Sequence, residues 1–251
     1  MENLGLVLAG GGSRGAYQVG AILALEELGI KANIVTGTSV GSINATFYAQ
    51  KEIDLLNRVW NEITFEQVMD RKFKWKNKSL ETLICSPFCG GFSVKPLGEL
   101  IKKYVNEDLI RKSDIKLGMV YTRPGRKYTP VTINDIPNGQ IVEHILTSSS
   151  AIPFLKKQEL NGVKCYDGFY TDNLPVELAI NMGATKIISI EIMKGFRQKV
   201  KNKEVKIFNL KPTKGLGFLL NFDQDKIKKN LQLGYNDVMA KKEELLNFIN
   251  S

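Results

Sequence analysis

Histidine and cysteine are scarce in this chain of 251 residues, which contains one histidine, His144, and three cysteines. An odd number of cysteines predicts reduced thiols rather than a disulfide framework. Cys85 and Cys89 lie close together in the sequence, but no second pair of ligands accompanies them. Because a zinc site needs about four Cys or His ligands, we expect no metal here.

Long apolar runs are also missing. No stretch approaches the roughly 18 consecutive apolar residues of a membrane-spanning helix. The amino terminus lacks the basic segment and the apolar core of a signal peptide. With 43% hydrophobic residues, the chain can bury one substantial core without disulfides. We therefore expect a cytoplasmic protein.

Glycine is abundant by contrast, and a first cluster occupies residues 10–15, Gly-Gly-Gly-Ser-Arg-Gly. It follows an apolar run at residues 4–9, which predicts a buried strand, and it precedes a predicted helix over residues 16–28 that Gly29 closes. Free N–H groups in such a loop, at a helix N-terminus, bind an anion. The anion is either a phosphate or the oxyanion of a tetrahedral intermediate.

Two residue patterns of phosphate-binding sites are missing, which argues against a phosphate ligand. A dinucleotide site needs an acidic residue about 20 residues after the glycines, where it binds a ribose hydroxyl. Residues 34–37, Ile-Val-Thr-Gly, stand at that place and offer no carboxylate. A Walker-type loop is excluded because no Gly-Lys-Ser/Thr follows the cluster. An oxyanion is the ligand that remains.

A second glycine-bearing segment, residues 37–41, reads Gly-Thr-Ser-Val-Gly between a predicted strand at Val35 and a predicted helix over residues 40–50. A sharp strand-to-helix turn projects its apex residue, here Ser39, and requires small neighbours. The start of the helix also favours a developing negative charge. The alternative is a glycine-rich turn with a solvated serine, since this pattern occurs by chance in about one such chain in ten.

A nucleophilic serine needs a base, and the usual histidine has no good candidate here. His144 lies among apolar, helix-like neighbours, which is typical of a packed histidine, and it precedes the acidic candidates rather than following them. A carboxylate within hydrogen-bond reach can serve instead. Asp167 and Asp172 are the candidates. Leu174-Pro175 follows them and leads into a predicted helix that ends before Gly183. The residue pattern leaves both open, together with an ordinary turn in which Asp167 caps its own backbone.

Taken together, these segments resemble a patatin-like phospholipase. The matching motifs are the glycine cluster, residues 37–41, Ser150-Ala151-Ile152-Pro153, and Asp167-Gly168 followed by Asn173 and Pro175. They run in family order from residue 4 to about residue 190. The resemblance implies an α/β fold, a three-layer sandwich in which helices flank a central, mostly parallel sheet. It also implies lipid acyl hydrolysis by a Ser-Asp dyad, without calcium or any other cofactor.

The resemblance assigns roles to residues of this chain. Ser39 is the nucleophile, Asp167 is the base, and the backbone of Gly10, Gly11 and Gly12 is the oxyanion hole. The supporting motif positions are Arg14, Gly15, Gly37, Gly41 and Gly168. One position departs from the family pattern, because Phe169 stands where a small residue usually follows Asp-Gly. Phe169 either shapes the acyl pocket or marks a shifted loop.

The chain divides into a predicted catalytic domain, residues 1–190, and a C-terminal basic segment and amphipathic helix, residues 191–251, packed on the same domain. Other predicted elements are more helix over residues 53–68, a core-facing helical stripe over 97–105, strands at 116–122 and 128–133 joined by a turn at 123–126, a strand at 186–190, and one long helix over 224–249. Residues 194–206 carry six cations.

Basic residues outnumber acidic ones by 35 to 26, which gives a net charge of +9. Such a surface attracts lipid headgroups or nucleic acids. Residues 71–78 interleave five cations with Phe73 and Trp75, which suits an anionic bilayer surface, although a solvated lysine-rich loop is the alternative. Residues 215–220 are a second candidate for membrane or lid contact, or a packed segment. No nucleic-acid-binding module is recognisable, so we expect no nucleic-acid partner.

The sequence therefore predicts a serine lipid acyl hydrolase, which cleaves a phospholipid or other acyl-ester lipid through an acyl-Ser39 intermediate, at the periphery of a membrane. An acyltransferase that uses the same acyl-enzyme is an alternative, because the intermediate does not dictate its acceptor. A non-catalytic basic protein that binds lipid or nucleic acid is another. Acyl transfer of the malonyl type is disfavoured, because that class needs a histidine late in the chain. Head group, acyl length and oligomeric state do not follow from the sequence.

Overall fold

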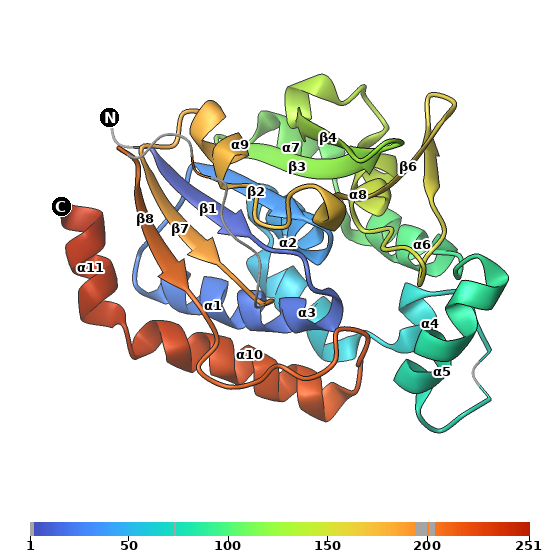
Figure 1. Cartoon of the computed structure of the whole chain (residues 1–251). Coiled ribbons are helices and arrows are strands. Elements are labelled where there is room, and N and C mark those ends of the chain that lie inside the picture. Colours follow the sequence, from blue (N-terminus) through green and yellow to red (C-terminus); the bar gives the residue numbers. More distant parts are fainter. Residues whose placement is uncertain (1–2, 73, 194–199, 201–203) are drawn as a thin grey trace.

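A twisted, mostly parallel sheet runs through the centre of the computed structural model (Figure 1). The structure describes residues 3–72, 74–193, 200 and 204–251. Phe73 and most of the cationic stretch at residues 194–206 lie outside the described residues. The strands are β1 (Leu4–Leu8), β2 (Ile34–Thr38), β3 (Lys116–Arg123), β4 (Lys127–Thr132), β5 (Gln158–Leu160), β6 (Val163–Asp167), β7 (Lys186–Ile190) and β8 (Lys206–Leu210).

The order of the strands across the sheet is β5-β6-β3-β2-β1-β7-β8, with β4 paired to the edge of β3. The five strands β3, β2, β1, β7 and β8 run parallel to one another. At the other end of the sheet, β4 and β6 each pair antiparallel with β3, and β5 pairs antiparallel with β6. Val7, Val35 and Ile187 are fully buried at the centre. Their apolar strands are buried on both faces, as parallel strands covered by helices must be.

Helices cover both faces of this sheet. The α-helices of the described residues are α1 (Gly15–Glu27), α2 (Val40–Ala49), α3 (Ile53–Glu62), α4 (Phe65–Val68), α5 (Lys78–Cys85), α6 (Lys95–Tyr104), α7 (Glu107–Lys112), α8 (Ile141–Ser148), α9 (Val176–Asn181), α10 (Gln224–Met239) and α11 (Lys242–Asn250). Figure 1 shows α9 on one side of the sheet and α1 with α10 on the other. The predicted three-layer α/β arrangement is therefore confirmed.

The crossing of α1 and α10 brings the C-terminal part of the chain against its beginning. A Cβ atom at Gly20 would lie 1.8 Å from the Leu231 carbonyl oxygen, and one at Gly234 would lie 2.0 Å from that of Tyr17. The two glycines therefore let the helix backbones touch. The Tyr17 hydroxyl adds a buried hydrogen bond of 3.0 Å to Asp237. The division of the chain at residue 190 stays a prediction, and β8, which follows that point, joins the same sheet as β7.

Local predictions are confirmed for β1, β3, β4, β7, α1 and α2, and wrong for the helix over residues 224–249. The helix predicted over residues 53–68 is found as two helices, α3 and α4, because the chain is extended at Ile63 and Thr64. Thr64 and Gln67 then cap the start of α4 with a capping box. The predicted helix over residues 224–249 also breaks, between Met239 and Lys242.

The break before α11 has a packing reason. It lets the ring of Phe248 reach Phe208 of β8, with ring centroids 5.5 Å apart, and Lys186 of β7 donates to the Ile249 carbonyl at 2.8 Å. A continuous helix would carry these residues away from the sheet edge. Within the described ranges, no helix combines the length and the apolar character needed to span a bilayer.

Candidate active site

Ser39 occupies the apex of the turn between β2 and α2. Its backbone has φ 56° and ψ −129°, a conformation that non-glycine residues rarely adopt. The flanking glycines make this turn possible: a Cβ atom at Gly37 would lie 2.1 Å from the carbonyl oxygen of Gly41, and one at Gly41 would lie 2.2 Å from that of Leu8. The pattern of small residues around Ser39 is thus a steric requirement of the turn.

Ser148, at the end of α8, holds the backbone of Ser39 and was missed by the sequence analysis. The Ser39 N–H donates to Ser148 Oγ at 3.0 Å, and Ser148 Oγ donates in turn to the Val120 carbonyl at 2.7 Å. This buried relay ties the turn to β3. The only sequence signal is that Ser148 opens the Ser-Ser-Ser run whose last member begins the Ser-x-x-Pro motif.

Asp167 lies at the end of β6 and faces Ser39. The Ser39 hydroxyl donates to Asp167 Oδ2 at 2.7 Å, and the Phe169 N–H donates to Asp167 Oδ1 at 2.8 Å. The Asp167 side chain is only 1% exposed. Burial raises the pKa of Asp167 to about 7, although the two hydrogen bonds favour the ionised form. The carboxyl group can therefore take up or release a proton near neutral pH.

The Ser-x-x-Pro segment supports this aspartate. The Asp167 N–H donates to the Ser150 carbonyl at 3.1 Å, and the Tyr170 hydroxyl donates to the Ile152 carbonyl. A Cβ atom at Gly168 would lie 2.2 Å from the Val120 carbonyl oxygen, so only glycine fits after the aspartate. The Ser-x-x-Pro motif thus packs directly against the Asp-Gly motif.

Asp172 and Phe169 have other surroundings. The Asp172 carboxylate accepts the Leu174 N–H at 3.2 Å, which is a local cap of the backbone. The structure therefore brings Asp167, and not Asp172, to the Ser39 hydroxyl. The Phe169 ring packs on Tyr170 with an edge-to-face geometry at 5.2 Å, and the cavity beside Ser39 is lined by other residues. Of the two roles expected for Phe169, the structure does not place it in the pocket wall.

The glycine loop lies beside the serine turn, but its three glycines differ. The Gly10 N–H donates to both the main-chain oxygen and Oδ1 of Asn173, each at 3.1 Å. Within the described part of the chain, the N–H groups of Gly11 and Gly12 donate to no protein atom. The backbone of Gly12 has φ 58°, and a Cβ atom there would lie 2.1 Å from the Leu219 carbonyl oxygen. Two amides of the loop are thus left for a ligand, and the amide of Gly10 is not.

Arg14 and Gly15 support the loop in different ways. Arg14 Nε donates to the Gly217 carbonyl at 2.9 Å and Arg14 Nη1 donates to the Ile192 carbonyl at 3.4 Å. A Cβ atom at Gly15 would lie 2.5 Å from Cγ2 of Val40, so Gly15 allows α1 to approach the serine turn. Arg14 therefore ties the glycine loop to residues 192 and 217, and Gly15 packs it against the start of α2.

Under the loop runs a chain of buried polar side chains that the sequence analysis missed. Trp60 Nε1 donates to Asn44 Oδ1 at 3.0 Å, Asn44 Nδ2 donates to Gln18 Oε1 at 2.9 Å, and Gln18 Nε2 donates to the Ala9 carbonyl at 2.8 Å. Because each member is buried and hydrogen-bonded, the chain fixes the end of β1 to α1, α2 and α3. No local pattern signals it, since its members come from three helices.

His144 lies on α8 and its side chain is buried, as the sequence predicts. Its ring lies edge-to-face on Tyr121 with centroids 5.7 Å apart, and its Nδ1 atom has no partner among the described residues. Burial lowers the pKa of His144. The hydrogen bonds of the Ser39 hydroxyl and the Asp167 carboxylate do not involve it.

A narrow apolar cavity of about 90 Å³ opens beside Ser39 and Gly12. Its walls come from α2, α3, α6 and the segment 219–222, and include Phe47, Trp60, Ile101, Leu219 and Phe222. The predicted helical stripe of α6 is found here, since Leu97, Leu100, Ile101 and Tyr104 all face the cavity. Among the described residues, no group of three Cys, His, Asp or Glu side chains is placed to hold a metal ion, and the three cysteines are free thiols.

Comparisons with known proteins agree with this arrangement. Residues 6–180 match the profile of the family described as patatin-like phospholipase. The chain is 30% identical over 194 residues to the Candida albicans protein named lysophospholipase NTE1, and 26% identical over 199 residues to human patatin-like phospholipase domain-containing protein 6. Each alignment covers 76% of this chain but 13% of the relative, so the chain spans a small part of these proteins.

Solved structures resemble the fold at low identity. The crystal structure of VipD from Legionella pneumophila superposes with a TM-score of 0.66 at 13% identity, and covers 97% of this chain and 67% of VipD. Human GIVD cytosolic phospholipase A2 gives a TM-score of 0.59 at 8% identity, and covers 99% of this chain and 60% of that protein. With a family profile matched over residues 6–180, the chain belongs to the patatin-like phospholipase family, a family of ester hydrolases.

Proposed function

We propose that the protein is a serine lipid acyl hydrolase in which Ser39 is the nucleophile and Asp167 is the base. The observation that carries the proposal is the 2.7 Å hydrogen bond from the Ser39 hydroxyl to a carboxylate that is 1% exposed, at the edge of an apolar cavity. A serine alcohol is a weak nucleophile until a base within hydrogen-bond reach removes its proton. Asp167 has that reach, and its raised pKa of about 7 makes it a stronger base than an exposed aspartate.

The reaction proceeds in two halves. Ser39 Oγ attacks the acyl carbonyl carbon while its proton passes to Asp167 Oδ2; the bond to the alcohol then breaks, and the alcohol leaves with that proton. The product is an ester of Ser39. Water attacks this ester, Asp167 takes the proton of the water, and the Ser39 hydroxyl is restored when the fatty acid leaves. Asp167 thus alternates between base and acid, which suits a pKa near the working pH.

The oxyanion of each tetrahedral intermediate is stabilised by backbone amides. We narrow the predicted hole to the amides of Gly11 and Gly12, because Asn173 occupies the amide of Gly10. The N-terminus of α2, which begins at Val40, adds a favourable dipole. Preorganised donors of this kind contribute about 3 kcal/mol each to transition-state stabilisation.

The substrate is an ester of a fatty acid, in our proposal a phospholipid or a related acyl-ester lipid. The cavity beside Ser39 is lined almost entirely by apolar side chains, and these match an acyl chain rather than a polar acyl group. Membership of the patatin-like phospholipase family supports the same class. We further propose a cytoplasmic protein that acts at the periphery of an anionic membrane, which its charge of +9 favours.

The test compares two isosteric substitutions on one loop. Asp167→Asn should lower kcat for a p-nitrophenyl fatty-acyl ester by about 10³-fold, because the amide is no base. Asp172→Asn is the matched control and should retain a kcat close to that of the parent, since the Ser39 hydroxyl donates to Asp167 and the Asp172 carboxylate accepts the Leu174 N–H. Equal activity of the Asp167→Asn protein and the parent would refute the assigned base.

A stability measurement separates lost chemistry from lost structure. Because burial raises the pKa of Asp167, ionising it costs folding free energy as the pH rises from about 4 to about 7. Asp167→Asn removes that cost, so its Tm at pH 8 should be equal to or above that of the parent. A lower Tm would mean that the substitution damages the fold, and the kinetic result would then need a second variant, Asp167→Ser.

A further inference from the structure

The apolar surface of the described chain is concentrated in one short segment. Of eight large apolar side chains that are exposed there, five lie between residues 75 and 88: Trp75, Leu80, Leu83, Ile84 and Phe88. Phe88, in the 3-10 turn Ser86–Cys89 after α5, is 89% exposed. Single exposed apolar residues need no explanation, but a contiguous group marks a contact surface. We call the surface of residue 72 and residues 74–88 the α5 surface.

The amphipathic pattern of α5 is inverted. Leu80, Leu83 and Ile84 recur at helical spacing and are 43–44% exposed, whereas Glu81 and Thr82 on the opposite face are buried. A helix on a water-facing surface normally buries its apolar stripe and exposes its charges. The polar side of α5 faces the protein, so its apolar side is left for a non-aqueous partner.

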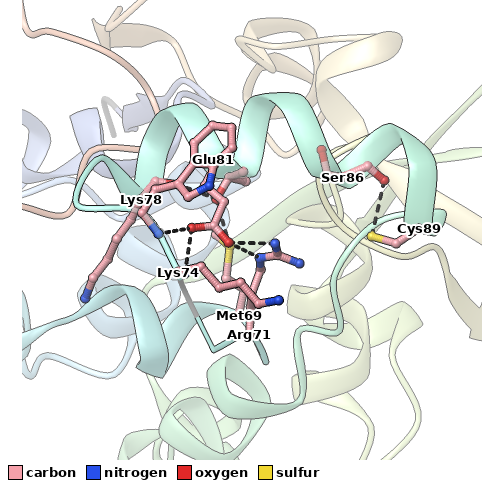
Figure 2. A network of polar contacts seen from close by, with 9 residues as sticks. Met69, Arg71, Lys74, Lys78, Glu81, Ser86 and Cys89 are labelled. Atoms are coloured by element: carbon pink, nitrogen blue, oxygen red, sulfur yellow. Dashed lines mark hydrogen bonds and ion pairs between the residues drawn. The ribbon is translucent and has the colours of Figure 1, made fainter.

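Glu81 holds this arrangement in place (Figure 2). Its carboxylate is 1% exposed and accepts four hydrogen bonds: from Arg71 Nε at 3.1 Å, Arg71 Nη2 at 2.6 Å, and the backbone N–H groups of Lys74 at 2.8 Å and Trp75 at 2.7 Å. Four donors offset the cost of burying one charge. The network fixes the backbone of Lys74 and Trp75 against the inner face of α5, while the Trp75 side chain is 45% exposed.

The charge around the apolar stripe is positive. Lys72, Lys74 and Lys76 are exposed in the same loop, and Asp70 is the exposed acidic residue that precedes them. Arg71 is paired with Glu81 and Lys78 with Glu66, at 2.6 Å and 2.5 Å. Exposed aromatic and aliphatic side chains in one segment with exposed lysines match an anionic bilayer, in which the aromatic rings enter the interface and the ammonium groups meet lipid phosphates.

The α5 surface is connected to the candidate active site. The Ser79 hydroxyl of α5 donates to the Leu220 carbonyl at 2.9 Å, and Leu220 with its neighbour Leu219 lines the cavity beside Ser39. Figure 1 shows α5 at the end of the molecule towards which β1 points, opposite α11. A surface at this end brings the mouth of the cavity close to whatever α5 contacts.

We propose that the α5 surface docks the protein on an anionic lipid membrane, with Trp75, Leu80, Leu83, Ile84 and Phe88 inserted in the interface and Lys72, Lys74 and Lys76 on the headgroups. The docked orientation offers membrane lipid to the cavity beside Ser39, and this last step rests on the proposed hydrolase function. The docking step does not, because it depends only on the surface.

The test measures vesicle binding in a Ser39→Ala background, so that no lipid is consumed. Binding to sedimented vesicles of phosphatidylcholine with phosphatidylglycerol should exceed binding to vesicles of phosphatidylcholine alone, and should fall with salt. The double variant Trp75→Ser/Phe88→Ser should bind at least about tenfold more weakly. Leu109→Ser/Tyr128→Ser is the matched control, because these side chains are 46% and 43% exposed on other elements, and it should bind like the parent.

The lysines are tested separately. Lys72→Gln/Lys74→Gln/Lys76→Gln should weaken binding by about 100-fold, at about fivefold per lysine. Lys228→Gln/Lys229→Gln/Lys242→Gln removes the same charge from exposed positions of α10 and α11 and should change binding far less. All substituted side chains are exposed, and an unchanged Tm for each variant verifies that folding is intact.

Two outcomes would overturn the docking proposal: equal vesicle binding by the Trp75→Ser/Phe88→Ser protein and its matched control, or a dimer in size-exclusion chromatography that only this variant abolishes. The second outcome would assign the α5 surface to another copy of the chain. Hydrolysis of a soluble short-chain ester by the Ser39-containing forms is measured in parallel. Vesicle binding without any hydrolysis would refute the proposed hydrolase and leave the docking surface standing.

Discussion

The turn that carries Ser39 and the loop of residues 10–15 lie side by side, yet they are held in different ways. The Ser39 turn depends on the small residues beside Ser39, since Gly37 packs on Gly41 and Gly41 packs on the end of β1, and a hydrogen bond to Ser148 braces its backbone. The loop instead depends on partners far along the chain: Asn173, 163 positions away, takes the Gly10 amide, and Gly217, 203 positions from Arg14, accepts the Arg14 guanidinium. The nucleophile thus lies on a five-residue motif with a distant brace at Ser148, while the glycine loop depends on several partners far along the chain.

The largest expected effect breaks the local turn. Gly41→Ala places a Cβ atom 2.2 Å from the Leu8 carbonyl oxygen, and backbone cannot yield as a flexible side chain can. We expect a loss of folding free energy of about 3 kcal/mol or more, and no measurable esterase activity. Urea unfolding and a p-nitrophenyl ester assay measure both. Gly139→Ala is a useful comparison, since open space surrounds that glycine and only its φ of 82° is unfavourable. Parent-like activity of Gly41→Ala would contradict the steric account of the turn.

The pH dependence sharpens the comparison, because only the serine turn has a titrating partner. Asp167 must be ionised to act as a base, and burial raises its pKa to about 7. We therefore expect kcat/KM to rise about tenfold per pH unit below pH 7 and to level off above it. The backbone amides of Gly11 and Gly12 do not titrate, so they add no further pH-dependent step to the profile of kcat/KM. A rise in kcat/KM centred near pH 4 instead of pH 7 would indicate that the base has the pKa of an exposed carboxyl group.

Weakening the support of the glycine loop, residues 10–15, should lower stability and activity less than Gly41→Ala in the Ser39 turn. Asn173→Ala removes both hydrogen bonds between the Asn173 side chain and the Gly10 backbone, at a buried position. We expect a loss of about 2 kcal/mol in stability and a fall in kcat rather than a rise in KM, since the oxyanion donors lose their alignment. Asn33→Ala, which removes an exposed hydrogen bond to Asn3, is the control. An unchanged kcat for Asn173→Ala would mean that the loop needs no such brace.

The smallest effect concerns the outer support of the loop. Arg14→Ala removes the contacts with the Gly217 and Ile192 carbonyls, one of 2.9 Å and one of 3.4 Å. About 1 kcal/mol of stability and a several-fold fall in kcat are expected, with Arg58→Ala on the exposed face of α3 as the control. If both arginine variants behave alike, the guanidinium of Arg14 has no role in the loop.

The same difference decides what could be predicted from the sequence. Short-range features were predictable: the strand before each glycine segment, the helix after it, and the need for small residues beside Ser39, where a Cβ atom at Gly37 would meet the Gly41 carbonyl. The close contacts of Gly41 with Leu8 and of Gly168 with Val120 join distant segments, so the local pattern does not show them. The residue pattern left Asp167 and Asp172 open, because the choice depends on the antiparallel pairing of β6 with β3. Sequence motifs of the family selected Asp167, whose carboxylate accepts the hydrogen bond of the Ser39 hydroxyl.

Long-range features could not be predicted. The occupation of the Gly10 amide by Asn173, the relay through Ser148 and the chain from Trp60 to Ala9 each join segments with no shared local pattern. Of the α5 surface, the sequence analysis named residues 71–78 as a candidate bilayer contact, but it missed the apolar stripe of α5 for a different reason. Its apolar residues at helical spacing suggest a buried stripe, and only the packing of Glu81 against Arg71 shows that the helix is turned the other way.

The most direct test of the central claim is the site of covalent labelling by a fluorophosphonate, followed by mass spectrometry of the digested protein. The account predicts one adduct, on the peptide that contains Ser39, no adduct in Ser39→Ala, and strongly reduced labelling in Asp167→Asn. His144→Ala should label at the parent rate, because the hydrogen bond of the Ser39 hydroxyl goes to Asp167. Undiminished labelling of the Ser39→Ala protein, or lost labelling in His144→Ala, would contradict the Ser39-Asp167 dyad.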